Sequence, residues 1–181
     1  MENLVEVKNL KKKYGSKEAV KDISFNIKEN EILGLLGPNG SGKTTTIGMM
    51  LGLLKPSNGE ILIDGKKIEE NRIETLQKIN FISPYIELPK KLTVKQNLIV
   101  YCKLYNVTDI KNRIEYLVEK LRLEDLLNRV TGELSSGQKN RASLAKALIN
   151  NPRVLFLDEP TASLDPEIGD FVRSFLENYK K

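Results

Sequence analysis

Eight consecutive residues, Gly37 to Thr44, have the types and spacing needed to hold a chain of phosphates. Their sequence, GPNGSGKT, matches G-x-x-x-x-G-K-[ST] at every fixed position, between an apolar segment and an apolar-periodic segment. The glycines let successive backbone N–H groups point at phosphate oxygens, and the following helix presents its positive end to the same anion. Lys43 supplies a mobile positive charge and the Thr44 hydroxyl can ligate Mg²⁺. A glycine-rich turn with a chance lysine is the weaker interpretation, because the strand, loop and helix patterns all agree.

A second chemical element is the pair of carboxylates Asp158-Glu159, which follows the apolar segment 154–157. A buried strand would deliver both side chains at its tip, where Asp158 would hold the Mg²⁺ shell, as in other P-loop NTPases. Glu159 could polarise an attacking water as a general base. Taken alone, an acidic pair that simply begins a loop would be the favoured explanation, but the glycine-rich loop makes the metal site the better hypothesis.

Alternating and helical patterns predict the elements that must position these residues. Strands are expected at Val5 and Val7, at Ile23 to Ile27, and, buried on both faces, at Ile32 to Leu36. The remaining expected elements are a helix over Thr44 to Leu54, short strands at Ile61–Ile63 and Ile79–Ile82, a helical insert of roughly Leu92 to Val130, a helix that follows Ser135–Gly137 and runs to about Ile149, a strand at Val154–Leu157 and a core-facing helix from about Pro166. The Asp64-Gly65 dipeptide predicts a tight turn.

Composition and charge give no indication of a nucleic-acid-binding protein, a reactive cysteine or a histidine base. The 181 residues are 40% hydrophobic and 29% charged, with a net charge of +5 spread along the chain, so nothing indicates a nucleic-acid partner. The single cysteine, Cys102, lies on a predicted apolar helical stripe, where packing is favoured over reactivity. The chain has no histidine, which removes the usual catalytic base.

Further motifs resemble the ABC (ATP-binding cassette) family. Leu134-Ser135-Ser136-Gly137-Gln138 is similar to its LSGGQ signature, and Asp158-Glu159-Pro160-Thr161 with Ser163-Leu164-Asp165 is similar to its Walker B motif and D-loop. A glycine-rich phosphate loop is shared by many NTPases, whereas these motifs in this order are highly specific. The resemblance implies an α/β P-loop NTPase fold with a mostly parallel core sheet, an N-terminal antiparallel β subdomain and a helical subdomain at about 92–130.

The resemblance also implies residue roles. The nucleotide ATP, with Mg²⁺, would be bound by Tyr14, stacked on adenine, and by Gly37, Pro38, Asn39, Gly40, Ser41, Gly42, Lys43, Thr44 and Thr45. The metal would be held by Thr44 and Asp158, and Glu159 would be the catalytic base. Ser135, Ser136, Gly137 and Gln138, with Lys139 and Arg141 nearby, would close over the ATP of a second cassette, and Asp165 would lie at that dimer interface.

Three positions depart from the family pattern. Ser136 replaces the first signature glycine, which is tolerable unless the position needs φ > 0. Pro84 stands where the Q-loop glutamine is expected, so another group must serve or coupling to the partner differs. The family's switch histidine lies on a strand beyond the final helix, so the resemblance implies that 1–181 is a single ABC ATPase domain that is C-terminally incomplete. A sheet without that strand would leave unpaired backbone beside the gap.

The leading hypothesis is an ATPase subunit that powers a membrane ABC transporter. It would be cytoplasmic and peripheral on the inner face of the cell membrane, with a transmembrane permease subunit and a homodimer or heterodimer of cassettes as partners. Two alternatives stay open: a truncated nucleotide-binding fragment with little or no ATPase activity, and a soluble ABC ATPase that acts without a transporter. One phosphate loop and no sustained heptads disfavour the last. Residues 83–98 weakly resemble exporter-type cassettes, and this resemblance favours export.

Overall fold

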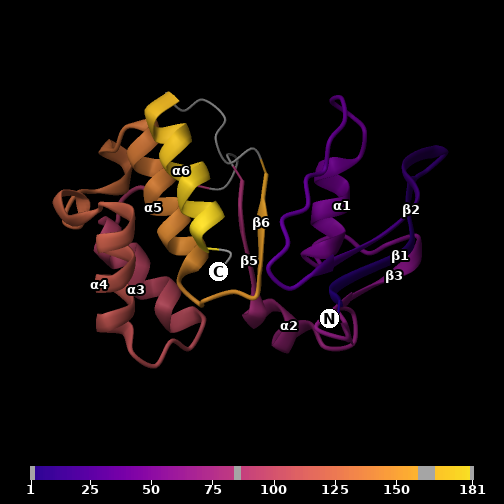
Figure 1. Cartoon of the computed structure of the whole chain (residues 1–181), viewed down its shortest axis with the longest axis horizontal. Helices are drawn as coiled ribbons and strands as arrows, with labels where there is room; N and C mark the ends of the chain where they lie inside the picture. Colours follow the sequence, from indigo (N-terminus) through magenta and orange to yellow (C-terminus); the bar gives the residue numbers. More distant parts are fainter. Residues whose placement is uncertain (1–2, 84–86, 159–165, 180–181) are drawn as a thin grey trace. The chain divides into compact units, whose positions relative to one another are not determined.

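The computed structural model describes residues 3–83, 87–158 and 166–179. Two compact units divide the chain, one of residues 1–76 and one of residues 77–179, and the boundary falls inside the short helix α2 (Arg72–Lys78). The chain contains both β-strands and α-helices, so the expected α/β class is confirmed (Figure 1). Helix α2 has no counterpart among the sequence predictions. In the described residues, no helix is long and apolar enough to cross a bilayer.

The first unit contains a four-stranded antiparallel sheet in the order β2-β1-β3-β4. Its strands are β1 (Asn3–Tyr14), β2 (Lys17–Lys28), β3 (Asn58–Ile63) and β4 (Lys66–Lys67). The turn predicted at Asp64-Gly65 joins β3 to β4, and both residues have positive φ, 56° and 71°. Two positive φ angles at the centre of a hairpin turn match the right-handed twist of the strands. The N-terminal antiparallel subdomain is therefore confirmed.

A bulge in β1 changes which residues face the core. Val5 and Val7 are buried, but the next buried residue is Leu10, because Asn9 has a φ of 48° and the pairing register with β2 shifts there. Asparagine tolerates this left-handed conformation better than most residues. The pairing register with β2 shifts again on either side of Lys12, so only Leu10 is buried in the rest of the strand.

The strand predicted at Ile32 to Leu36 is wrong. Residues 31–38 have no regular secondary structure, and Leu36 is 95% exposed. An apolar segment is stable as a buried strand only when neighbouring strands complete its hydrogen bonds, and no described strand pairs with this one. The helix that follows, α1 (Lys43–Met50), forms as expected and packs against β2.

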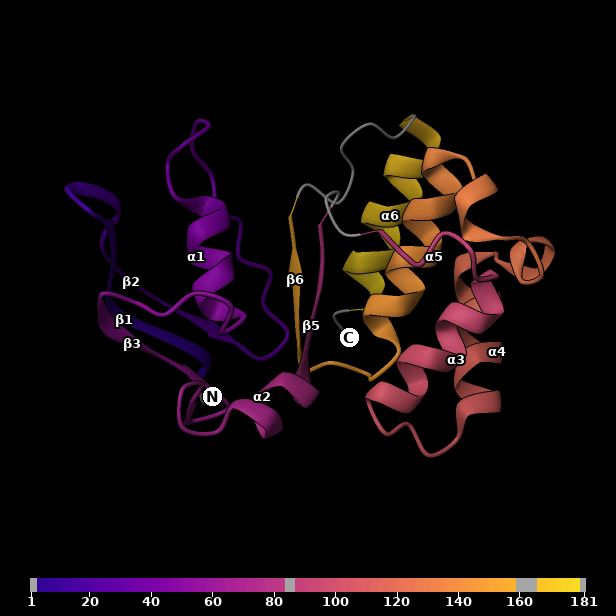
Figure 2. The same cartoon turned by 180° about the vertical axis from the view of Figure 1, so that it is seen from behind.

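The second unit holds β5 (Ile79–Ile82) and β6 (Val154–Leu157), which pair in parallel. Helices gather on one side of this pair in both views (Figures 1 and 2). They are α3 (Val94–Leu104), α4 (Ile110–Leu121), α5 (Ser136–Leu148) and α6 (Pro166–Tyr179), with short 3-10 turns at Glu124–Leu126 and Thr131–Glu133. One apolar core joins them, with Leu98, Leu117, Ala145 and Val172 fully buried.

Backbone hydrogen bonds join the two ends of segment 92–130. The backbone N–H of Val94 donates to Arg129 O at 3.0 Å, and the N–H of Thr131 donates to Leu92 O at 3.0 Å. Both α-helices of this segment begin with a side-chain cap. Thr93 and Gln96 form a capping box on α3, and Asp109 caps α4. Cys102 is fully buried, and burial raises its thiol pKa, so its predicted role as packing is confirmed.

Arginines close the ends of the antiparallel helices α4 and α5. Arg113, on α4, donates to the carbonyls of Leu148 and Ile149 at the end of α5. Arg141, on α5, donates to Leu121 O and, at 2.6 Å, to Arg122 O at the end of α4. Each guanidinium satisfies carbonyls that no helical N–H can reach and complements the negative end of a helix.

Lys146 is the charged residue most deeply placed in the described core. It is 7% exposed, and its ammonium donates to Phe81 O at 3.1 Å. The same ammonium lies 5.3 Å from the Phe81 ring centroid and 5.5 Å from that of Tyr101. The side chain thereby links α5, β5 and α3. Burial lowers its pKa, since the low-dielectric core penalises the charged form.

We expect Lys146→Met to be more stable than Lys146→Ala by about 2–4 kcal/mol, because methionine keeps the packed stem while alanine leaves a cavity. Below the lowered pKa of the folded state, the folded parent carries the full cost of the buried charge. That cost disappears as pH rises from the lowered pKa of the folded state towards the ordinary value of 10.5. Urea unfolding from pH 7 to 10 should therefore show the parent gaining stability relative to Lys146→Met. A difference that stays constant with pH would contradict this.

Candidate functional site: a phosphate-binding loop at an uncapped helix

The glycine-rich loop reaches α1 through Gly42, which is the N-cap residue and has a φ of 93°. A side chain could not fit there. A Cβ on Gly42 would overlap the carbonyl oxygen of Ala19 and would lie 3.2 Å from Val20 Cγ2. The loop therefore lies directly against β2, and only glycine permits both the conformation and the close approach.

The N-terminus of α1 differs from those of α3, α4 and α5. Those three helices have Thr93, Asp109 and Ser135 as side-chain caps, whereas Gly42 offers none and the first turn of α1 contains no acidic residue. The unpaired backbone N–H groups and the positive end of the helix dipole remain available to an external anion. This arrangement suits a phosphate group.

Lys43 points back over the loop. Its ammonium donates to Gly37 O at 2.7 Å and to Pro38 O at 3.0 Å. Thr44 is exposed in the first turn of α1, and Thr45 behind it is half-buried. A bound phosphate chain would compete with the two carbonyls for the ammonium, since an anion forms the stronger, charge-assisted hydrogen bond.

Tyr14 lies at the end of β1, in the same unit as the loop. It pairs with Lys17 across the turn at Gly15, and Ala19, which touches the loop, follows two residues later. Two residues of strand span about 7 Å. The Tyr14 ring is 49% exposed, so it remains accessible to a ligand. Its expected stacking on adenine stays a prediction.

Asp158 belongs to the second unit. Its backbone N–H donates to Ile82 O at 2.9 Å, which extends the β5–β6 pairing to the carboxylate-bearing residue. A parallel strand thus places Asp158 at its carboxyl end, as predicted. Glu159 and Asp165 lie outside the described residues, as does Pro84.

The signature residues begin α5. Ser135 is the N-cap: its Oγ accepts from Gln138 N at 3.3 Å, and Gln138 Oε1 accepts from Ser135 N at 3.0 Å. Ser136 is helical without positive φ, so replacing glycine there introduces no strain. Arg141 is not a free cation for an anion at this end, because its guanidinium is held at the end of α4.

Thr44 in the first unit and Asp158 in the second each carry an oxygen donor of a type that Mg²⁺ accepts, and their joint binding of the ion stays a prediction. Among the described residues there is no cluster of three or more His, Cys, Asp or Glu side chains that could hold a metal by itself. Mg²⁺ ordinarily takes one or two protein oxygens and completes its shell with phosphate and water. The exposed Thr44 hydroxyl and the Asp158 carboxylate are donors of that kind.

Sequence reasoning missed Lys12, whose ammonium lies 5.1 Å from the centre of the Tyr14 ring. The available signal was spacing, since residues i and i+2 of a strand share a face. The buried Lys146 was missed as well. A lysine inside an apolar helical stripe was the signal there.

Replacing Gly42 by alanine should unfold the loop. We expect a lower thermal unfolding midpoint and at least a tenfold loss of nucleotide affinity, because left-handed strain of about 1–3 kcal/mol adds to the overlap with Ala19. Gly34→Ala is the matched control, since a Cβ there meets nothing within 4 Å. The steric argument fails if both variants melt and bind alike.

A sequence model of the family described as ABC transporter matches residues 20–162, well over half of the chain. The chain belongs to the ABC transporter family. Two similar proteins are the Nod factor export ATP-binding protein I of Burkholderia orbicola and the bacitracin transport ATP-binding protein BcrA of Bacillus licheniformis. Each is 39% identical, over 90% and 92% of this chain respectively. The chain spans about half the length of these relatives, 54% of each.

Solved ABC structures share the fold. CbiO1 of Clostridium perfringens, described as part of the transporter complex cbiONQ, has a TM-score of 0.86 and 32% identity, over 99% of this chain and 74% of that one. The ATP-binding cassette MJ0796, described as dimeric and bound to ADP and Pi, has a TM-score of 0.86 and 30% identity, over 98% of this chain and 83% of that one. The expected P-loop NTPase fold is therefore confirmed.

Proposed function

We propose that this chain is the ATP-binding and ATP-hydrolysing part of an ABC transporter. The observation that carries the proposal is the uncapped N-terminus of α1, with Lys43 directed over the glycine loop. Three other helices of the same chain receive side-chain caps, so the missing cap marks this terminus as an anion site. ATP supplies that anion, in agreement with the relatives named as ATP-binding proteins.

The chain's residues would divide the work as follows. Lys43 and the loop N–H groups hold the phosphates, and the half-exposed Tyr14 ring stacks on the base. Mg²⁺ would be held by Thr44 and Asp158, and it neutralises phosphate charge when bound. Glu159 accepts a proton from the attacking water, because this carboxylate directly follows the aspartate proposed to hold the metal.

A second cassette would complete the site. The signature residues beginning α5, of which Ser135 and Ser136 are exposed, would contact the nucleotide of the partner, with Asp165 at the interface; the similar MJ0796 cassette is described as dimeric. A permease subunit would dock on the helical subdomain, about 92–130, and hold the protein at the cytoplasmic face of the membrane. Relatives named for bacitracin transport and Nod factor export support a transporter of this kind.

Equilibrium binding tests the proposal. Isothermal titration of the 181-residue chain with ATP, ADP and AMP, each with Mg²⁺, should show affinity that rises with the number of phosphates. The expected Kd for ATP lies between about 1 μM and 1 mM, a usual range for enzyme substrates. Equal affinity for AMP and ATP would contradict a site built around the α1 terminus.

A further inference from the structure

Lys12 and Tyr14 form a cation–π pair at the end of β1. The Lys12 ammonium lies 5.1 Å from the Tyr14 ring centroid and donates to Lys55 O at 2.7 Å. We propose that Lys12 is a positioning residue, which covers one face of the Tyr14 ring and holds the other face ready to stack on the nucleotide base. The inference rests on the proposed function, in which Tyr14 contacts that base.

Strand register places this pair on the face that carries the glycine loop. Lys12 is paired with Val20 on β2, and paired residues project their side chains to the same face. Val20 Cγ2 is 3.2 Å from where a Cβ on Gly42 would lie, so this face touches the loop. The contact between the Lys12 ammonium and the Tyr14 ring places Tyr14 beside Lys12.

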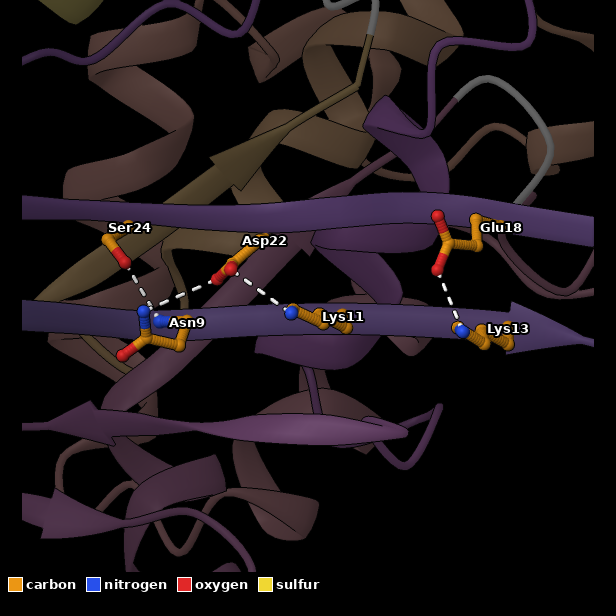
Figure 3. Close-up of polar contacts among 6 residues, drawn as sticks. All are labelled: Asn9, Lys11, Lys13, Glu18, Asp22 and Ser24. Atoms are coloured by element: carbon orange, nitrogen blue, oxygen red, sulfur yellow. Dashed lines mark hydrogen bonds and ion pairs between the residues drawn. The ribbon is translucent and has the colours of Figure 1, made fainter.

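Lysines at the neighbouring positions are paired with acids. Figure 3 shows Lys11 with Asp22, at 3.1 Å, and Lys13 with Glu18, at 2.9 Å. These lysines lower the pKa of the Asp22 and Glu18 carboxyls. Asn9 completes the group by donating to Asp22 and, through its backbone N–H, to Ser24. Both of these lysines are thus balanced by a carboxylate, whereas the Lys12 ammonium is held by the Lys55 carbonyl and the Tyr14 ring.

Lys12 is fixed by the backbone around it. Ser57 N donates to Lys11 O at 2.8 Å, and Lys13 N donates to Ser57 Oγ at 3.0 Å, so the segment that carries Lys55 is tied to β1 on both sides of Lys12. The carbonyl that receives the Lys12 ammonium is thus a rigid acceptor. An ammonium held in place in this way can restrict the Tyr14 ring.

The pair has a physical consequence for binding. A free aromatic side chain loses rotamer freedom when a ligand stacks on it, and a ring that is already restricted loses less. The cation is attracted to the π face by about 0.5–1 kcal/mol at an exposed site. Tyr14 is 49% exposed, so a base can still reach the ring.

The test compares ATP with inorganic triphosphate, which lacks the base. Lys12→Met should weaken ATP binding by about 2- to 5-fold, the fold-change equivalent to that cation–π energy, and leave triphosphate binding unchanged. Lys12→Arg should restore ATP affinity, because guanidinium also lies on aromatic rings. Lys13→Met removes the same charge from a lysine that is paired with Glu18 and makes no contact with the ring, so it is the control, with no expected loss. Thermal melting verifies that each variant is folded.

A double-mutant cycle with Tyr14→Ala decides the mechanism. Lys12→Met should have no further effect on ATP affinity once the ring is absent. Equal losses for ATP and triphosphate, or an undiminished effect of Lys12→Met without the ring, would overturn the inference. Failure of the unsubstituted chain to bind ATP or triphosphate would instead overturn the proposed function, so the two failures are distinguishable.

Discussion

Glu159→Gln should lower the rate of ATP hydrolysis by about 10²–10⁴-fold while ATP binding stays within about twofold of the parent. The amide keeps the size and polarity of the side chain but cannot accept the proton of the attacking water. Glu159 is the carboxylate next to Asp158, the residue proposed to hold the metal. Phosphate release by the variant and the parent, at saturating MgATP, measures the effect.

Glu115→Gln is the matched control for that substitution. Glu115 is exposed on α4, and its replacement makes the same chemical change away from the phosphate loop. Its hydrolysis rate should remain within about twofold of the parent, as is usual for a surface substitution. If Glu159→Gln hydrolyses ATP as fast as Glu115→Gln, Glu159 is not the base.

Lys43→Met should reduce affinity for MgATP by about 10- to 150-fold, and hydrolysis should fall at least as much. Hydrogen bonds to charged groups contribute about 1.5–3 kcal/mol, which corresponds to that change in affinity. The folded state should tolerate the change, because Lys43 is only half-buried and its two bonds are to carbonyls of the exposed loop. Calorimetric titration and thermal melting measure the two effects.

Lys28→Met provides the comparison for Lys43→Met. Lys28 is exposed at the other end of β2 from the residues that touch the loop, so its loss changes net charge without altering the phosphate contacts. Its ATP affinity should match the parent at moderate salt, where exposed charges are screened. A comparable loss in both variants would mean that overall charge, and not Lys43, governs binding.

Local patterns predicted most of the elements correctly. Alternation located β1, β2 and β3, the Asp64-Gly65 dipeptide located a turn with two positive φ angles, and helical spacing located α3, α4, α5 and α6. These features depend on residues close together in the chain, and their periodicity is visible in any short window. The capping boxes on α3 and α5 are local in the same sense.

Elements that depend on distant partners were predicted less well. The segment Ile32–Leu36 has the composition of a buried strand but forms none, because a strand exists only with hydrogen-bonding neighbours. Helix α2 is short and has one buried residue, Thr75, so it lacks the apolar stripe that identifies longer helices. The bulge at Asn9 also carries no periodic signal before the register with β2 is known.

The sequence by itself determined the family and the chemistry of the phosphate loop, because G-x-x-x-x-G-K-T specifies backbone conformations and a charge within eight adjacent residues. Tertiary structure decided what those residues touch. It placed Gly42 against Ala19, left α1 without a cap and turned Lys12 towards Tyr14. It also buried Lys146 against Phe81 and Tyr101. Contacts of this kind depend on strand register and helix packing, and distant parts of the chain must meet before either exists.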